Sequence, residues 1–274
     1  MNALEIQGLT KRRGSFTLGP IDLTLPSGCI LGLIGENGAG KSTTIKLILE
    51  MIRRDSGSIR VLGQEKLQKQ DIGVVLDEVG IPACLTTDQV SRVMAGIFKN
   101  WDEAAYRSYL KRLDIPGKKA FSSFSRGMKM KLGIAVALSH HPRLLLLDEP
   151  TNGLDPVARD EVVDILEDFT RDEDHAVLIS SHIVSDLEKL CDYIAFLHKG
   201  QLLLMEEKDR LLEEYGIFRG SREALNALSR EAVLYRKVTD YGCQALVRRD
   251  AAPGLALGPI GIEELFVCMA KEAN

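Results

Sequence analysis

The sequence contains no long apolar run, no closely spaced pair of cysteines and no excess of basic residues. Its longest uninterrupted apolar stretches, such as residues 134–138 and 144–147, fall far short of the roughly 20 residues that a membrane helix needs. The N-terminal segment has no apolar core of the kind found in secretory signals, so we expect no signal peptide. These absences exclude a self-contained membrane protein.

The cysteines are odd in number, and no two of them form a C-x-x-C pair. They are Cys29, Cys84, Cys191, Cys243 and Cys268. A disulfide framework or a zinc site requires closer, paired spacing. We therefore interpret these residues as small apolar side chains in a reducing compartment.

The charge balance is slightly acidic, with 35 Lys and Arg against 39 Asp and Glu, a formal net charge of −4. Nucleic-acid-binding proteins usually carry a basic excess, so we expect no nucleic-acid partner. The composition, 45% hydrophobic and 27% charged, is that of a globular protein rather than a collagen-like or mainly disordered chain. A chain of 274 residues can form one large domain or two small ones around a substantial core.

Apolar runs separated by turn-forming residues predict an α/β fold with a buried sheet. The run at 29–34 is short and continuous, as in a strand covered on both faces, and short strands and turns are expected before it. Residues 86–140 show mostly helical spacing, and Asp155-Pro156 is a good start for a helix that runs to about residue 170. The other expected elements are strands at 57–63, 72–76, 144–147, 176–179 and 193–197, and helices at 42–52 and 185–191.

The tail after about residue 210 has shorter and more mixed elements. They are expected to be helices near 221–229 and 262–271 and strands near 232–238 and 243–248. We therefore predict two domains, residues 1–210 and a small accessory α+β domain at 211–274.

The segment 35–42 has the pattern G-x-x-x-x-G-K-[ST] between a predicted strand and a predicted helix, the context of a phosphate-binding loop. Its glycines let the backbone turn tightly and aim N–H groups at phosphate oxygens. Lys41 adds a positive charge for the β- and γ-phosphates, the Ser42 hydroxyl can bind Mg²⁺, and Thr43 can reach an outer phosphate. The predicted nucleotide-binding residues are Gly35, Asn37, Gly38, Ala39, Gly40, Lys41, Ser42 and Thr43.

Two carboxylates, Asp148 and Glu149, follow the apolar strand at 144–147. Mg²⁺ prefers a few carboxylates together with water and phosphate oxygens, so Asp148 fits the metal side. Glu149 is placed to polarise an attacking water as a general base. An acidic strand end is weak evidence alone and becomes strong only together with the phosphate loop.

Four further segments, taken in order, complete a family resemblance. They are Asp77 after the strand at 72–76, FSRGM at 124–128, NGLD at 152–155 and ISSH at 179–182. These resemble the Q-loop, signature, D-loop and switch histidine of the ATP-binding subunits of ABC transporters, and the resemblance covers residues 1 to about 210. Within that family the S-R-G-M variant and the acidic Q-loop residue are similar to the bacitracin-export-like group, which pairs with ABC-2-type membrane subunits.

The resemblance implies the P-loop NTPase fold of an ABC-type cassette. This fold has a RecA-like mixed sheet core, an antiparallel β subdomain and a helical subdomain, here at about 78–140. A small C-terminal α+β extension would follow it. The groove near 77–100 would receive a coupling helix of a polytopic membrane permease. The chain would then be cytoplasmic, held peripherally on the inner face of the membrane.

The resemblance also implies how the residues act. Two ATPase subunits, as a homodimer or heterodimer, would enclose ATP and Mg²⁺, with Ser125, Arg126 and Gly127 of one chain facing the phosphate loop of the other. Glu149 and His182 would be catalytic, and Asp155 would communicate across the interface.

Three positions depart from the family pattern. An aromatic residue usually stacks on adenine; Arg13 stands where a tyrosine is expected, and Phe16 is the nearest substitute, although an arginine can also stack on a base. Asp77 replaces the Q-loop glutamine and retains a metal-binding carboxylate but not the amide donor, with Glu78 as an alternative. Arg126 stands where glycine is usual, and it either reaches a phosphate or points to solvent.

Histidines outside the motifs, among them His141 and His198, are interpreted as structural or surface residues. Two other functions remain open at this point. A soluble, non-transport ABC ATPase with a regulatory role usually has two cassettes or a long coiled-coil insertion, which this length does not permit. An unrelated P-loop kinase or GTPase would leave the 124–128 segment unexplained, and the sequence has no N-K-x-D guanine motif.

Overall fold

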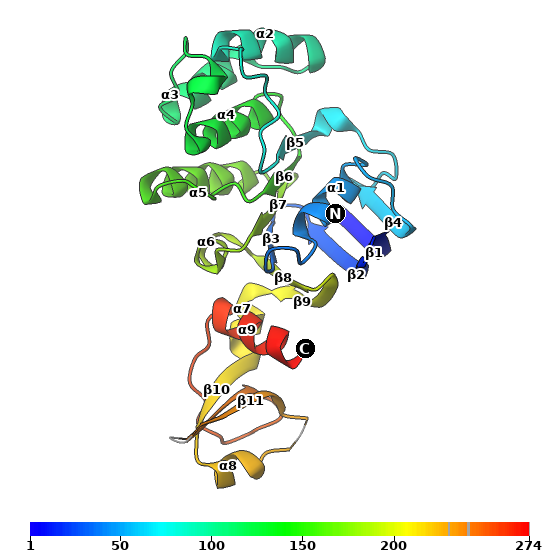
Figure 1. Cartoon of the computed structure of the whole chain (residues 1–274), viewed down its shortest axis with the longest axis vertical. Helices are drawn as coiled ribbons and strands as arrows, with labels where there is room; N and C mark the ends of the chain where they lie inside the picture. Colours follow the sequence, from blue (N-terminus) through cyan, green and yellow to red (C-terminus); the bar gives the residue numbers. More distant parts are fainter. Residues whose placement is uncertain (230, 240–241, 274) are drawn as a thin grey trace.

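A six-stranded sheet lies at the centre of the chain in the computed structural model, which describes residues 1–229, 231–239 and 242–273 (Figure 1). Its strand order is β5-β6-β7-β3-β8-β9, parallel except for the last strand, β9, which runs antiparallel. The strands are β3 (Ile30–Ile34), β5 (Ile72–Val75), β6 (Leu144–Asp148), β7 (Ala176–Ser181), β8 (Tyr193–His198) and β9 (Gln201–Glu207).

Both faces of this sheet are covered, as the continuous apolar runs predicted. Along β6, Leu145 and Leu147 join one apolar cluster while Leu144 and Leu146 join the other, the period-2 alternation of a strand between two layers. The helices that flank the sheet are α1 (Lys41–Ile48), α5 (Pro156–Thr170) and α6 (Val184–Leu190). The predicted helix at 42–52 is therefore real, but it ends at Ile48.

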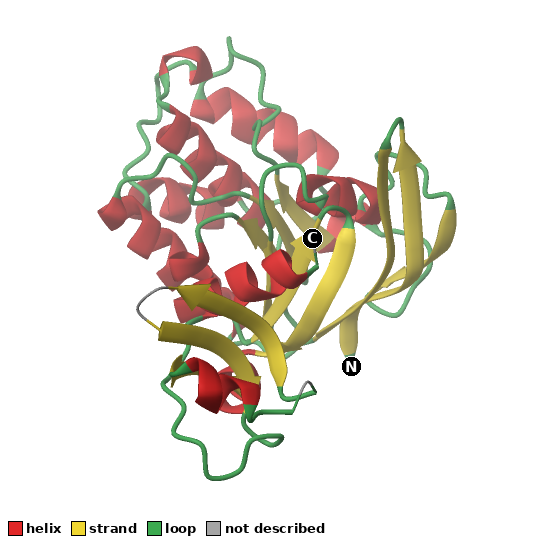
Figure 2. Cartoon of the chain, turned by 60° about the horizontal axis from the view of Figure 1, so that its bottom comes forward, coloured by secondary structure: helices red, strands yellow, loops and turns green. Residues whose placement is uncertain are grey.

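A second, antiparallel sheet, of order β2-β1-β4, packs on the α1 side of the core. Its strands are β1 (Asn2–Arg13), β2 (Phe16–Pro26) and β4 (Ser56–Val61). Buried side chains such as Leu4, Leu25 and Ile59 share one apolar cluster with Ile45 of α1. Figure 2 shows this sheet standing apart from the main group of helices.

The predicted helical region is confirmed between β5 and β6. It contains α2 (Thr87–Ile97), α3 (Glu103–Arg112), η2 (Phe121–Ser123) and α4 (Arg126–Leu138), whereas the short helix η1 (Lys69–Asp71) comes just before β5. Thr86 begins α2 with a full capping box, in which its side chain and that of Gln89 exchange hydrogen bonds with each other's backbone. These helices gather at one end of the molecule, far from the C-terminal sheet (Figure 1).

The C-terminal part adds a small sheet of order β10-β12-β11 and then returns to the core. Its elements are α7 (Lys208–Glu214), β10 (Tyr215–Gly220), α8 (Arg222–Asn226), β11 (Val233–Thr239), β12 (Gly242–Arg248) and α9 (Ile262–Glu272). Phe266 of α9 lies against Phe196 of β8, with ring centroids 5.3 Å apart. Sequence patterns predicted α8, β11, β12 and α9 but not β9, α7 or β10. The domain boundary at residue 210 stays a prediction.

Within the part of the chain that the structure describes, every helix is too short or too polar to cross a bilayer.

Candidate nucleotide-binding site

The candidate site lies where three parallel strands end at the same edge of the central sheet. The loop 35–40 follows β3, Glu149 follows β6, and His182 follows β7. Because β3 pairs with β7 and β7 pairs with β6, these segments converge, as ligand sites in open α/β sheets do. They form a cleft of about 660 Å³, which is lined by Arg13, Phe16, Glu36, Asn37, Gly38, Gly40, Lys41, Ser42, Thr43, Asp77, Glu149, Asn152 and His182.

The backbone of the loop after β3 forms the tight cradle that the sequence predicts. Gly40 has φ +114° and precedes the first residue of α1; a Cβ on it would lie 2.6 Å from the Leu18 Cδ1 atom. Gly38 also has positive φ, +84°. An L-residue at these positions would be strained, so glycine is required for the loop to curl around a phosphate. The N–H groups at the start of α1 supply the donors that an anion needs.

Lys41 is buried at the N-terminus of α1 and faces the cleft. Its Nζ atom donates to the Gly35 carbonyl oxygen over 2.7 Å and lies 3.1 Å from the Glu149 Oε1 atom. The ammonium therefore stays inside the loop, where phosphate oxygens would replace or join its carboxylate partner. Buried charge of this kind is tolerated because it is paired.

Glu149 links the two other predicted functional groups. Its Oε2 atom lies 2.6 Å from the His182 Nδ1 atom and also accepts the His182 backbone N–H over 3.3 Å. Only 11% of the Glu149 side chain is exposed, whereas 38% of the His182 side chain is. Lys41, Glu149 and His182 thus form one continuous row of charged and hydrogen-bonding groups along the cleft.

Asp148 is held by a serine that sequence reasoning did not single out. The Ser180 hydroxyl donates to the Asp148 Oδ1 atom over 2.6 Å and accepts the Glu149 backbone N–H over 3.2 Å. Both Asp148 and Ser180 are buried. The sequence contains one clue to this role, the pair of serines before His182. The role itself follows only from the pairing register of β6 and β7, which places Ser180 directly beside Asp148.

Side-chain oxygens near the loop could supply some, but not all, of the ligands of a hard cation. Ser42 offers a hydroxyl and Asp148 a carboxylate, the ligand chemistry that Mg²⁺ prefers. Among the described residues no cluster of three His, Cys, Asp or Glu side chains is arranged to hold a metal ion. Protein ligands at this edge would therefore complete the coordination of an ion that phosphates and water also hold.

Asp77 lies in the cleft, but its carboxylate contacts the guanidinium of Arg126 rather than standing alone. Both side chains are about half exposed. Arg126 therefore neither points freely to solvent nor enters the phosphate loop of its own chain. The metal role predicted for Asp77 stays a prediction.

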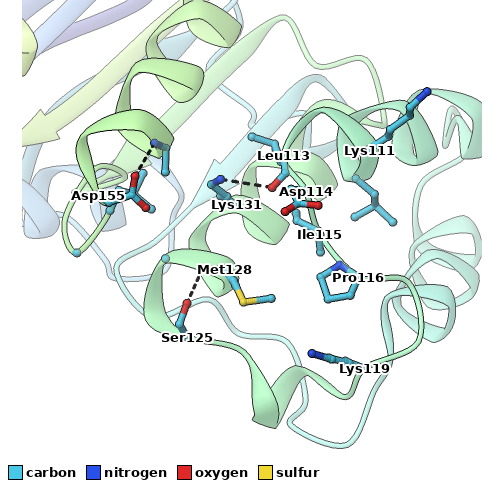
Figure 3. A pocket seen from close by; sticks show the side chains of 15 residues that line it. Lys111, Leu113, Asp114, Ile115, Pro116, Lys119, Ser125, Met128, Lys131 and Asp155 are labelled. Atoms are coloured by element: carbon cyan, nitrogen blue, oxygen red, sulfur yellow. Dashed lines mark hydrogen bonds between the residues drawn. The ribbon is translucent and has the colours of Figure 1, made fainter.

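Two of the predicted signature residues, Ser125 and Gly127, face a different pocket, shown in Figure 3. This pocket has a volume of about 570 Å³ and includes Ser125, Gly127 and Asp155 in its lining. Ser125 begins α4 as its N-cap and accepts the Met128 N–H over 3.2 Å. Neither Ser125 nor Gly127 lines the cleft around Lys41. One chain therefore carries the phosphate loop and these two signature residues on separate surfaces.

The predicted base-stacking residue, Phe16, lines the cleft. Phe16 is half-buried, and its ring packs close to Gly40, since a Cβ there would lie 3.3 Å from the Phe16 Cζ atom. Arg13 lines the same cleft and is exposed. Both side chains are available to a planar base.

Comparisons with known proteins agree with this geometry. Residues 18–152 match the family model described as ABC transporter. The chain is 37% identical over 211 residues to the lantibiotic transport ATP-binding protein SrtF of Streptococcus pyogenes, which covers 75% of this chain and 91% of that protein. It is 34% identical over 215 residues to the bacitracin transport ATP-binding protein BcrA of Enterococcus faecalis, covering 73% and 68% respectively.

Solved structures share the fold as well. An ATP-binding subunit of an ABC transporter superposes with a TM-score of 0.70 at 27% identity, over 76% of this chain and 91% of that one. A dimeric ATP-binding cassette with bound ADP and Pi gives a TM-score of 0.66 at 20% identity, over 75% and 98%. The cradle, the acidic strand end and these similarities together show that the chain belongs to the ABC transporter family, as one of its ATP-binding ATPase subunits.

Proposed function

We propose that the chain binds ATP with Mg²⁺ and hydrolyses the γ-phosphate bond to power export through a separate membrane permease. The observation that carries the proposal is the row Lys41–Glu149–His182 at the end of three parallel strands. A phosphate-binding lysine and a carboxylate within 3.1 Å of it are the two groups that nucleotide hydrolysis needs in one place.

Each side chain then has a distinct role. The loop amides and Lys41 bind the β- and γ-phosphates, Thr43 reaches an outer phosphate, and Phe16 packs on the adenine. Glu149 accepts a proton from the attacking water, with His182 orienting its carboxylate. Mg²⁺, when bound, neutralises charge on the phosphates, and Ser42, Asp148 and Asp77 are the residues that would hold it.

Two subunits are needed to complete each site. The phosphate loop and the signature residues Ser125 and Gly127 line separate pockets of one chain, and Arg126 contacts Asp77. In a dimer, the signature of the partner chain would close over the phosphates, and Asp155 would lie at the interface. The fold shared with dimeric cassettes supports this arrangement. Both Glu149 and His182 are present, so a homodimer would have two hydrolytic sites, and a heterodimer with a related subunit is also compatible.

The permease would dock in a groove between the helical region and the core. A groove of about 480 Å³ has an apolar lining that includes Met51, Met94, Ile97 and Phe98. Met51 and Ile97 are each more than half exposed, which suits residues that another protein covers. The chain would thereby be held on the cytoplasmic face of the membrane. The lantibiotic and bacitracin transport relatives favour this role over that of a soluble regulatory ATPase.

Replacing Lys41 tests the phosphate-loop assignment. Lys41→Ala should abolish binding of a fluorescent ATP analogue, because the loop loses its only buried ammonium among the described residues. Lys46→Ala, on the same helix, is the matched control and should bind as the wild type does. Equal affinity in the Lys41 variant would refute the assignment.

Purification from membranes tests the transport role. The intact chain should co-purify with a polytopic membrane protein, and ATP hydrolysis should depend on that partner being folded. Recovery of the chain only from the soluble fraction, with full activity, would instead favour a non-transport ATPase.

A further inference from the structure

A buried histidine that the nucleotide site does not use lies directly behind the phosphate loop. His198 is the last residue of β8, and β8 pairs in parallel with β3, the strand that leads into the loop. Only 6% of its side chain is exposed, and its Nδ1 atom lies 3.1 Å from the Glu36 Oε1 atom. At this distance the imidazole and the carboxylate form an ion pair when the ring is protonated.

The turn after His198 supports the same loop through its backbone. Gly200 donates its N–H to the Ala39 carbonyl oxygen over 2.9 Å. At the other end of the loop, a Cβ on Gly35 would collide with the Leu197 carbonyl oxygen. The end of β8 therefore contacts the phosphate loop at both of its ends, and His198 lies between these contacts.

Glu36 connects His198 to the phosphate-binding lysine. Its side chain reaches back to His198, while its carbonyl oxygen accepts the Ala39 N–H over 3.1 Å and lies 3.4 Å from the Lys41 Nζ atom. The side chain of Glu36 is half exposed and would be free to rotate without a partner. Glu36 thus contacts His198 through its side chain and lies beside Lys41 through its carbonyl oxygen.

We propose that His198 is a positioning residue for ATP binding, which acts through Glu36 to hold the phosphate loop in its receptive shape. The inference rests on the proposed ATP-binding function. It identifies a residue outside the sequence motifs that affects ATP affinity. A loop held in its bound shape before the ligand arrives loses less conformational freedom on binding, so affinity is higher. His198 is not among the residues that line the cleft, so we expect its effect to fall on binding rather than on chemistry.

A double-mutant cycle tests the proposal on the intact chain. His198→Ala and Glu36→Ala should each raise the KM for ATP roughly three- to tenfold, the scale of one charge-assisted contact, with kcat changed less than about twofold. The double variant should be no worse than either single variant, because both remove the same contact. Glu36→Gln retains an acceptor oxygen and should keep most of the affinity.

The matched control is another histidine–carboxylate pair, far from the cleft. His141 lies 3.2 Å from Asp102, so His141→Ala removes a similar contact and should leave the KM unchanged. Additive effects in the double variant, an unchanged KM, or a loss of kcat alone would overturn the proposal. If His198→Ala fails to fold, an unchanged KM in Glu36→Ala still overturns the proposal, and that side chain is half exposed.

The proposed function and this inference fail in different ways. A wild-type chain that neither binds nor hydrolyses ATP would refute the proposed function. Suppose instead that the wild type binds ATP, that Lys41→Ala abolishes this binding, and that the Glu36 and His198 variants retain it. That result would refute only the role of His198.

Discussion

At the scale of the residue, Glu149 combines an unusual backbone with a central position in the site. Its φ is +54°, in the left-handed region that non-glycine residues seldom adopt. That conformation costs on the order of 1–2 kcal/mol, and the contacts to Lys41 and His182 offset it. The backbone turn directs the carboxylate out of the strand and into the cleft.

Glu149→Gln should reduce ATP hydrolysis by about 10²–10⁴-fold, because an amide retains the shape of the side chain but cannot accept a proton from water. ATP binding should persist, since Lys41 and the loop are unchanged. Phosphate release and nucleotide binding measured on the same preparation check this. Glu167→Gln, at an exposed position of α5, is the control, and wild-type turnover in the Glu149 variant would exclude Glu149 as the base.

The motif residues of the site could be predicted from sequence because each motif is local. Lys41, Asp148 and His182 each follow a buried strand within a short recognisable pattern. Ser180 and Glu36 could not be assigned roles in the same way. Their partners, Asp148 and His198, are distant in sequence, and only the register between neighbouring parallel strands brings them together.

At the scale of the element, helix α5 begins as its sequence predicts. The Asp155 Oδ1 atom accepts the N–H groups of Val157 and Ala158 over 3.1 and 3.0 Å, and Pro156 occupies the first helical position. The Ala158 N–H, and secondly that of Val157, hold the pKa of the Asp155 carboxyl below its usual range. The same side chain therefore fixes the loop that leads from Glu149 to the helix.

The stability of wild type relative to Asp155→Asn should depend on pH. The folded-state pKa of Asp155 is lowered, so its stabilising effect is complete above the usual aspartate pKa, about 4. That effect disappears as the pH falls through the lower folded-state pKa. Asparagine also caps helices but does not titrate.

Thermal unfolding of both proteins from pH 7 downward measures this difference. The wild type should have the higher Tm at neutral pH, and the gap should close in acid. A gap that is independent of pH would show that the charge of Asp155 contributes nothing to the cap.

The elements that the sequence did not predict lie between residues 201 and 220. In β9 the middle five residues are all only partly buried, so no alternation marks it as a strand. Helix α7 consists mostly of charged residues, and Leu211 is its one buried side chain. Such elements form because neighbouring chain segments pair with them, as β8 does with β9, and this information is not local.

At the scale of the whole molecule, the chain leaves the core, forms the small sheet and then returns. Helix α9 lies between that sheet and the cassette in Figure 1. The Glu188 carboxylate of α6 accepts the Ile262 N–H at the start of α9 over 3.3 Å, and Phe266 packs on Phe196. Because α6 begins soon after His182, the C-terminal part rests on an element next to the site.

Phe266→Ala should loosen the C-terminal part from the cassette and lower the free energy of unfolding by about 2 kcal/mol, since Phe266 is only half-buried. Limited proteolysis should then cleave the chain near residue 210 faster than in the wild type. Val267→Ala is the control, because that side chain is 40% exposed on the same helix. Equal proteolysis of all three proteins would mean that α9 does not hold the two parts together.

The convergence of three strand ends makes the site sensitive to the length of its strands as well as to the identity of its residues. Adding one residue inside β7 would turn every later side chain of that strand to the opposite face. Ser180 would then move away from Asp148, and His182 away from Glu149, although no residue type had changed. Surface loops distant from this edge can vary in length without such an effect. Insertions and deletions should therefore be excluded from these strands more strictly than substitutions are.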